Sequence, residues 1–301
     1  MVIRKRKVKK VHNQRFTVMD LLLFLILTLF AITIVFPFYT SIVVSFMSEH
    51  EYLKNPFTLI PKEIVFDSYD TLIKQGNIVS GYKNTLIHLA LGMPISMYLT
   101  CTLAYALSKR YFPGKKILFV FIMITMVFGG GTVPAFLNIK ELGLINNRWS
   151  VVLSNGIGTF YVILVMNYIH TLPNSLFDSA RIDGANEMTI MFRIVLPLSK
   201  PILATVGLFY MVDKWNEWYG SMLYLNKASL YPLQLELKQI IANAQILDDV
   251  MMTDSMYRSM PTFSMGIKMA AVVLTMLPIM CVFPFLQKYF VKGVTLGAVK
   301  G

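Results

Sequence analysis

The sequence predicts an all-α integral membrane protein with six transmembrane helices. More than half of its 301 residues, 55%, are hydrophobic and only 15% are charged, and the mean hydropathy is +0.59, so an ordinary soluble domain is excluded. The apolar residues form runs close to the roughly 20 residues that a helix needs to cross a bilayer. Continuous runs favour helices over the alternating strands of a membrane barrel. The predicted spans are Leu21–Phe46, Asn84–Leu107, Ile117–Leu137, Ser150–Ile169, Pro201–Tyr224 and Ile267–Tyr289.

The distribution of charge predicts the orientation of these spans. With both termini in the cytoplasm, the cytoplasmic segments hold 17 of the 28 basic residues but only 4 of the 16 acidic ones. This asymmetry satisfies the positive-inside rule. The net charge of +12 therefore reports topology. We interpret the basic run Arg4–Lys7 as a topological anchor or a contact to anionic lipid, in preference to a nucleic-acid site.

The first predicted span follows a basic cytoplasmic segment, residues 1–20. Its apolar run is too long for a signal peptide and no small-residue cleavage pattern follows it, so we expect it to be retained as an anchor. Pro37 within the span predicts a kink. The external loop that follows, Glu49–Lys83, is punctuated by Pro56 and Pro61, which predicts a short extended piece and then a helix along the interface.

The second and third spans each contain residues that are unusual inside a membrane. His88 is either a proton relay or, in the preferred interpretation, a neutral hydrogen-bonding partner for a neighbouring helix. Phe128–Pro134 contains three glycines and a proline, which predicts a break in the third helix. Gly130 and Gly131 are therefore candidates to line a pathway, and a simple packing kink is an equal alternative. A phosphate-binding loop is excluded because no Lys-Ser/Thr pair follows.

Between the fourth and fifth spans lies Thr171–Lys200, the only long polar segment between two apolar ones that has a helical pattern of its own. Thr171 and Pro173 predict the start of a short helix. Asp183-Gly184 breaks this helix, since glycine tolerates the left-handed backbone of a tight reversal. A second short helix follows, and we expect Leu196-Pro197 to stop it. The product is a pair of short helices at the membrane surface.

Several residues of this segment follow one another in a known order: Asp178, Ser179, Ala180, Asp183, Gly184, Ala185, Phe192, Leu196 and Pro197. The order resembles the EAA signature of permease subunits in bacterial ATP-binding-cassette (ABC) importers, which is Glu-Ala-Ala, two residues, Asp-Gly-Ala, a gap, an aromatic residue and Leu-Pro. Asp178 and Ser179 stand where the signature has Glu and Ala. We expect this difference to affect the affinity for a partner or the choice of partner. The resemblance implies a coupling helix that sits in a groove of an ATPase subunit. An ordinary cytoplasmic loop helix is the alternative.

A polar cluster interrupts the fifth predicted span. It consists of Trp215, Asn216, Glu217 and Trp218. Aromatic rings stack on the apolar face of a sugar while amide and carboxylate groups bind hydroxyls, so the cluster suits a carbohydrate. The carbohydrate permeases of the family have a similar cluster, and an interfacial aromatic belt is an equal alternative.

The second external segment predicts an amphipathic helix over Leu233–Ile246 and no metal site. The aspartates that follow, Asp248, Asp249 and Asp254, do not have the spacing of an EF-hand. Cys101 and Cys281 lie in separate spans and offer neither a redox pair nor a metal site. The sequence has no Walker motif and no catalytic set, so the chain cannot hydrolyse ATP by itself and no residue is assigned as catalytic.

The end of the chain resembles the endings of sugar-importer permeases. The resemblance implies that Gly297, Lys300 and Gly301 reach the ATPase interface. We therefore expect three parts: the cytoplasmic N-terminus 1–20, a six-span permease domain 21–290 with its coupling loop 171–200, and a cytoplasmic tail 291–301.

The resemblance implies a permease subunit of an ATP-driven, binding-protein-dependent oligosaccharide importer in a bacterial cell membrane. The implied partners are a second related permease, two ATPase subunits that bind the ATP and Mg²⁺, an extracytoplasmic binding protein and the lipid bilayer. The substrates it most resembles are complex oligosaccharides of plant, algal or host origin. An ion-coupled secondary transporter is the alternative. It predicts acidic residues near the bilayer centre and inverted repeats. Apart from Asp213 and Glu217 near one end of the fifth span, the predicted spans contain no acidic residue, and the sequence shows no repeat. A membrane-bound enzyme would need a nucleophile or metal set that is missing.

Overall fold

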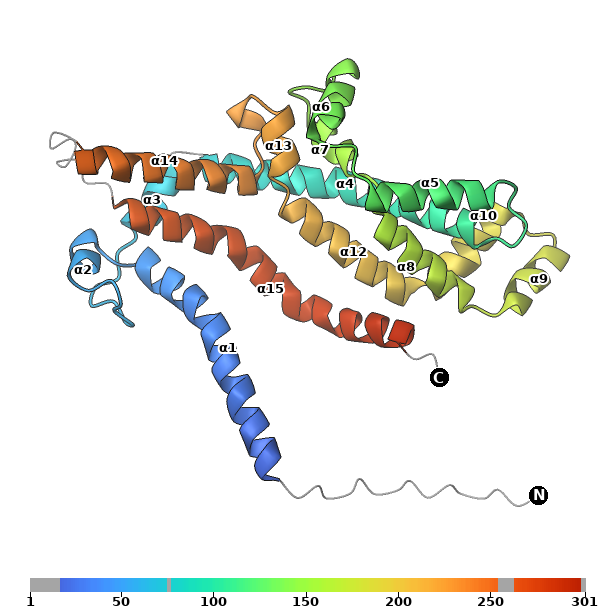
Figure 1. Cartoon of the computed structure of the whole chain (residues 1–301), viewed down its shortest axis with the longest axis horizontal. Coiled ribbons are helices and arrows are strands. Elements are labelled where there is room, and N and C mark those ends of the chain that lie inside the picture. The colour runs from blue at the N-terminus through green and yellow to red at the C-terminus, as the bar shows by residue number, and fades with distance from the viewer. Residues whose placement is uncertain (1–16, 75–76, 254–262, 299–301) are drawn as a thin grey trace.

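The computed structural model describes residues 17–74, 77–253 and 263–298, in which every regular element is a helix (Figure 1). Three helices are each long and apolar enough to cross a membrane. They are α1 (Val18–Ser45), α4 (Asn77–Ser108) and the Ser264–Pro284 part of α15 (Ser264–Ala298). Three further pairs of helices qualify when each pair is counted as one bent span. The predicted six spans match this upper limit.

The first helix, α1, is the most exposed of the candidate spans. It runs without interruption through Pro37, and only Val43, Val44 and Ser45 near its end are buried. In Figure 1 the N-terminal part of α1 stands away from the other helices, whereas its C-terminal part packs against α15. A row of exposed leucine, isoleucine and phenylalanine side chains therefore remains for contact with lipid or with another membrane protein.

Two of the bent pairs lie in the middle of the chain. The helices α5 (Lys115–Val127) and α6 (Thr132–Glu141) meet at 117°, and α7 (Arg148–Ser154) and α8 (Thr159–His170) meet at 48°. The glycine-rich segment is thus confirmed as a helix break. Gly131 has a φ of +85°, a conformation that favours glycine. The bend turns α6 away from the direction of α5, so the third predicted span corresponds to a bent pair of helices.

The fifth predicted span, Pro201–Tyr224, was wrong as one continuous helix. α12 (Lys200–Trp215) ends before the polar cluster, and the shorter α13 (Tyr219–Tyr224) begins after it. The reason is local. One carboxylate oxygen of Glu217 accepts the backbone N–H groups of Gly220 (2.7 Å) and Ser221 (3.2 Å), so it caps the start of a new helix.

Short helices form the segments that the sequence assigns to the outer side. They are α2 (Glu49–Lys54), α3 (Asp67–Lys74), a 3₁₀ turn (Ala228–Leu230) and α14 (Leu233–Thr253). The predicted interfacial and amphipathic helices correspond to α3 and α14. α14 packs against α4 and α15. Asp254, Arg4–Lys7 and the start of the basic N-terminus lie outside the described residues.

Three apolar clusters lie among the described helices, and the smallest of them joins the end of α1 to the start of α15 around Val43, Val44 and Met47. The other two are larger. One joins α4, α8 and α12 to the segment 171–200, through Ala104, Val162, Ile190, Val195 and Val206 among others. The second joins α3, α4, α14 and α15 around Trp215, Leu233 and Ala270. The segment 171–200 is therefore packed on the spans and is not a free loop.

Several polar residues are buried in the described spans, among them Asn84, Thr85, His88, Ser96 and Thr100 on α4. His88 is buried on α4, yet neither of its ring nitrogens has a hydrogen-bond partner among the described protein groups. The expected hydrogen bond to a neighbouring helix is therefore wrong for this residue. Cys101 is buried and Cys281 is exposed, and both are free thiols.

Candidate functional site

The segment 171–200 begins with α9 (Asn174–Ile182), which starts after Pro173 and ends in a tight turn. Gly184 has a φ of +79°. Its N–H donates to the carbonyl oxygen of Arg181 at 3.0 Å, and the N–H of Ala185 donates to that of Ala180 at 2.9 Å. These bonds satisfy the last carbonyls of the helix, as a glycine-terminated helix end requires. The predicted break at Asp183-Gly184 is confirmed.

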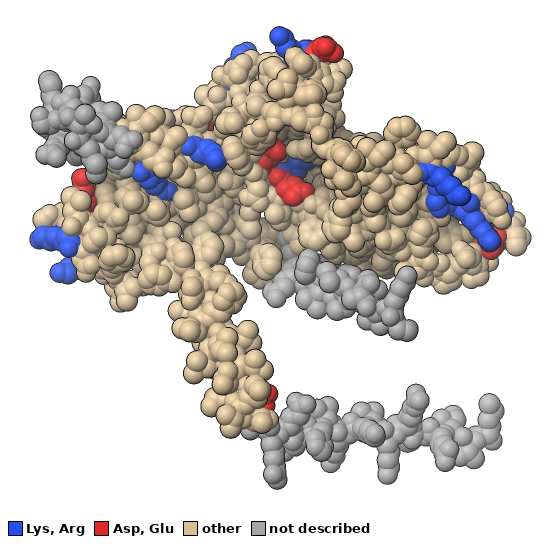
Figure 2. Space-filling view, in the orientation of Figure 1, with Lys and Arg blue, Asp and Glu red and all other residues tan. Residues whose placement is uncertain are grey.

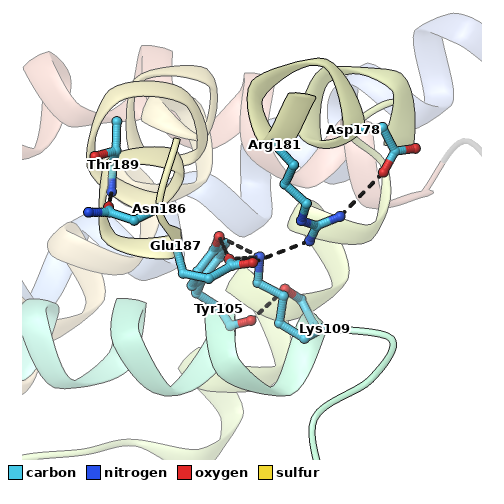
Figure 3. Close-up of polar contacts among 8 residues, drawn as sticks. Tyr105, Lys109, Asp178, Arg181, Asn186, Glu187 and Thr189 are labelled. Carbon is cyan, nitrogen blue, oxygen red and sulfur yellow. Dashed lines mark hydrogen bonds and ion pairs between the residues drawn. The ribbon is translucent and has the colours of Figure 1, made fainter. Parts of the chain in front are cut away.

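The second part of the segment is a continuous helical stretch of mixed type. It consists of α10 (Glu187–Ile190), a π-helical turn (Met191–Val195) and α11 (Leu196–Leu198). The side chain of Asn186 caps its start by accepting the N–H of Thr189 at 2.8 Å (Figure 3). The prediction that Leu196-Pro197 stops this helix is confirmed. The helical stretch ends at Leu198, directly after Pro197, and the chain bends by 83° at Ser199.

A network of charged and phenolic groups ties this segment to the end of α4. Glu187 accepts hydrogen bonds from the hydroxyl of Tyr105 at 2.6 Å and from the ammonium group of Lys109. The guanidinium of Arg181 bridges Glu187 (3.4 Å) and Asp178 (3.3 Å). In Figure 3 these side chains come from α4, α9 and α10 and point toward one another. We call this set the coupling network: Tyr105, Lys109, Asp178, Arg181 and Glu187.

The electrostatics of the coupling network favour its charged form. Burial by itself would raise the pKa of the Glu187 carboxyl. The hydrogen bonds from Lys109 and Tyr105 and the positive charges of Lys109 and Arg181 outweigh burial and hold the pKa below its ordinary value of 4.5. The Lys109 side chain is 18% exposed and its nitrogen lies 3.9 Å from the centre of the Tyr105 ring. The network therefore fixes how the two short helices sit on α4.

The surface of the same segment exposes large apolar side chains among its charged ones. Ile182, at the end of α9, is 86% exposed, and Leu176, Met188 and Phe192 are also exposed. On the inner face Ala180 is buried, and Phe177 packs against the core. Exposed apolar side chains at the tip of a rigidly held element are typical of a docking surface. The sequence analysis missed Ile182, because this residue lies between two charged residues and off the periodic apolar face.

The residues of the EAA-like signature are distributed over both faces. Asp178, Ser179, Asp183, Gly184, Phe192 and Pro197 are exposed, Ala185 and Leu196 are half-buried, and Ala180 is buried. The coupling network could not be found from the motif, because Tyr105 and Lys109 lie about 80 residues before it. At the end of the chain, Gly297 lies in α15, while Lys300 and Gly301 are outside the described residues.

Three helix breaks come together away from the segment 171–200. Hydrogen bonds link Thr125 to Thr159 (3.2 Å), Thr132 to Tyr219 (3.1 Å) and Asn155 to Glu217 (3.4 Å), and so join the breaks of α5–α6, α7–α8 and α12–α13. A side chain added at Gly130 would meet nothing within 4 Å, so this glycine borders open space. Figure 2 shows acidic side chains next to a basic one in a hollow near the middle of the molecule.

The structure separates the members of the polar cluster. Trp215 is buried and donates its indole N–H to the carbonyl oxygen of Thr275 at 3.3 Å. Asn216 is exposed and accepts a hydrogen bond from Gln234. The ammonium nitrogen of Lys238 lies 3.7 Å from the centre of the Trp218 ring. Trp215 thus packs inside, and Asn216 and Trp218 lie at the surface. Within the three described ranges, no group of three or more His, Cys, Asp or Glu could hold a metal ion.

Comparisons with known proteins give a consistent result. Residues 84–296 match the family model of the binding-protein-dependent transport system inner membrane component. The chain is 38% identical to the polygalacturonan/rhamnogalacturonan transport system permease protein YtcP of Bacillus subtilis (strain 168), over 94% of this chain and 98% of that protein. It is also 38% identical to protein LplC of the same organism, over 90% of each chain.

A solved structure extends the similarity to three dimensions. It is the crystal structure of a bacterial ABC transporter involved in the import of the acidic polysaccharide alginate. The similarity has a TM-score of 0.83 at 28% sequence identity and covers 92% of this chain and 100% of the matched chain.

Proposed function

The chain belongs to the family of binding-protein-dependent transport system inner membrane components, and we propose that it forms half of an oligosaccharide pathway. As a member it is a multi-pass membrane permease subunit of an ABC importer and not an enzyme. ATP hydrolysis belongs to separate ATPase subunits. This membership argues against an ion-coupled secondary transporter.

The observation that carries the proposal is the construction of the segment 171–200. Its inner face is packed on the spans and fixed by the coupling network, and its outer face presents exposed apolar side chains around Ile182. A rigid element with an apolar tip suits an ATPase groove, because movement of the groove would move the spans with it. We assign ATPase contact to the residues of the EAA-like signature and to Ile182. ATP and Mg²⁺ would be bound by the ATPase subunits.

The assembly that we propose contains a second, related permease and two ATPase subunits, with an extracytoplasmic binding protein that delivers the substrate. The exposed apolar side chains of α1 offer surface for the second permease and for lipid. The excess of basic residues in the assigned cytoplasmic segments supports placing both termini, the tail residues Gly297, Lys300 and Gly301 and the segment 171–200 in the cytoplasm.

The substrate class that we propose is an oligosaccharide from a plant or algal polysaccharide. Two relatives support it by name: the permease for polygalacturonan and rhamnogalacturonan, and the alginate importer. Gly130, Gly131, Asn216, Glu217 and Trp218 are the proposed pathway residues, since the breaks that carry them converge and several of them are exposed. Trp215 supports these residues from inside the core.

The test compares two glycines with the same backbone conformation. Gly184 (φ +79°) lies in the segment 171–200 and Gly143 (φ +68°) lies in a loop on the predicted outer side. A valine at either position is strained by about 1–2 kcal/mol. We expect Gly184→Val to abolish co-purification of the ATPase subunits and Gly143→Val to retain it. Normal ATPase association in Gly184→Val would contradict the assignment, and equal loss in both variants would indicate general misfolding.

A further inference from the structure

Three side chains at and just after the end of α12 converge on the break between α7 and α8. Tyr210 and Lys214 are four residues apart, a spacing that places them on one face of α12, and Glu217 follows two residues after the last residue of this helix, Trp215. Each of them bonds to the residues around Asn155–Gly158. We call these three residues the α12 clasp.

The α12 clasp replaces the backbone hydrogen bonds that the break removes. The ammonium group of Lys214 donates to the carbonyl oxygens of Val152 (3.1 Å) and Asn155 (3.3 Å), at the end of α7. On the other side of the break, the N–H of Gly158 donates to the hydroxyl of Tyr210 at 2.9 Å. Helix ends inside a membrane need such partners, because lipid offers none.

Lys214 is held in this position by its surroundings. Its side chain is only 4% exposed, although a buried ammonium group is costly unless its donors are satisfied. It lies against Gly92 of α4, where an added Cβ atom would come within 3.1 Å of its Cε atom. The glycine thus makes room for a lysine that crosses from α12 to the broken span.

The α12 clasp also connects α8 and α12 at their ends farthest from the segment 171–200. α8 leads into the segment 171–200 after His170, and α12 leaves it at Lys200. The two helices pack against each other and share one apolar core. They are joined at one end by the segment 171–200 and at the other end by the α12 clasp. At a rise of about 1.5 Å per residue, the 16 residues of α12 carry this connection over roughly 24 Å.

We propose that the α12 clasp makes α8, the segment 171–200 and α12 move as one rigid unit, and that Lys214 is the positioning residue that passes this movement across the helix break to α7. The proposal rests on the proposed function, since it needs an ATPase that displaces the segment 171–200. Its consequence is that loss of the Lys214 ammonium group separates ATP hydrolysis from movement at the converging helix breaks.

The experiment uses the complete importer in lipid nanodiscs. Cys101→Ala and Cys281→Ser remove the native thiols, and spin labels are placed at exposed positions on either side of the break, Trp149 on α7 and Phe160 on α8. The distance between the labels is measured by pulsed electron paramagnetic resonance, without nucleotide and after trapping with ATP and vanadate. Lys214→Met keeps the length of the side chain but removes its donors. Lys83→Met, at an exposed position of α4, is the matched control.

In the parent and in Lys83→Met we expect the distance between the labels to stay constant and narrowly distributed with and without trapping, because the α12 clasp carries α7 along with α8. In Lys214→Met we expect a broader distribution and a distance that changes on trapping, while ATPase activity stays within about twofold. Lys214→Arg, which can still donate to both carbonyl oxygens, should restore the narrow and constant distance. A narrow and constant distance in Lys214→Met would overturn the proposal.

If Lys214→Met does not assemble, Tyr210→Phe takes its place. It removes the hydroxyl that accepts the Gly158 N–H. A broader distance distribution is then expected, and an unchanged one would again overturn the proposal. Failure of the proposed function would look different, because ATPase subunits would then be absent from the parent complex as well.

Discussion

Two lysines lie at opposite ends of the unit formed by α8, the segment 171–200 and α12, and they use their charge in different ways. Lys109 lies in the coupling network, where its ammonium group meets the carboxylate of Glu187 at the surface. Lys214 lies in the α12 clasp, where its ammonium group meets two backbone carbonyl oxygens in the interior. The first lysine orients one element on another. The second takes the place of backbone partners that a broken helix has lost.

The energetic consequences differ accordingly. An exposed ion pair contributes about 0–1 kcal/mol, because water and salt screen it. A buried polar group that loses its partner costs about 1–3 kcal/mol. Changes at the α12 clasp should therefore disturb the fold more than changes at the coupling network, although the network lies closer to the proposed ATPase contact.

The largest effect is expected from overfilling the space beside Lys214. Gly92→Leu forces a branched side chain against the Lys214 stem and should destabilise the permease by about 1–3 kcal/mol. The measurement is the temperature at which the solubilised complex loses its single size-exclusion peak. Gly130→Leu is the matched control, because a side chain there meets nothing within 4 Å. Equal melting temperatures for the two variants would show that the site beside Lys214 is not tightly packed.

A smaller effect is expected from reversing the central charge of the coupling network. Glu187→Lys places a third positive group beside Lys109 and Arg181, so the two short helices should lose their fixed orientation. We expect ATPase binding to weaken about fivefold, which corresponds to about 1 kcal/mol, with little change in melting temperature. Combining Glu187→Lys with Lys109→Glu restores one ion pair and should recover part of the affinity. A large loss of thermal stability in the single variant would reverse the contrast between the two regions.

The smallest effect is expected from pH. The folded pKa of Glu187 is lowered, so its ion pairs contribute fully above the unfolded carboxyl value of 4.5 and are lost as the pH falls through the lowered folded value. The difference in stability between the parent and Glu187→Gln should therefore be constant from about pH 6 to 8 and shrink below about pH 4.5. Thermal unfolding at a series of pH values measures it. A difference that changes between pH 6 and 8 would assign the titration to another group.

The same contrast explains what the sequence could predict. Hydropathy and charge predicted the spans, and the ordered EAA-like residues predicted the helix, tight turn and second helix of the segment 171–200. The break at Asn155–Gly158 was not predicted, because only Gly156 and Gly158 mark it within an apolar run. The coupling network and the α12 clasp join residues about 50 to 80 positions apart. Such pairs depend on packing, which periodicity in a single sequence does not reveal.

Details of helix ends were also beyond the sequence. Pro197 was expected to stop a helix, and the helical stretch does end at Leu198, but the π-helical turn that precedes Pro197 was not predicted. Trp215 was assigned to the same polar cluster as Trp218. Only the packing of α12 against α4 and α15 turns the first ring inward and leaves the second at the surface.

The central claim is that the segment 171–200 faces the cytoplasm and docks on an ATPase, and labelling at Ile182 tests it most directly. The Ile182→Cys variant, without the two native cysteines, is treated with a membrane-impermeant maleimide in inside-out and right-side-out vesicles. We predict labelling only in inside-out vesicles, and its loss when the ATPase subunits are bound. Labelling from the outer side, or labelling that bound ATPase leaves unchanged, would contradict the account.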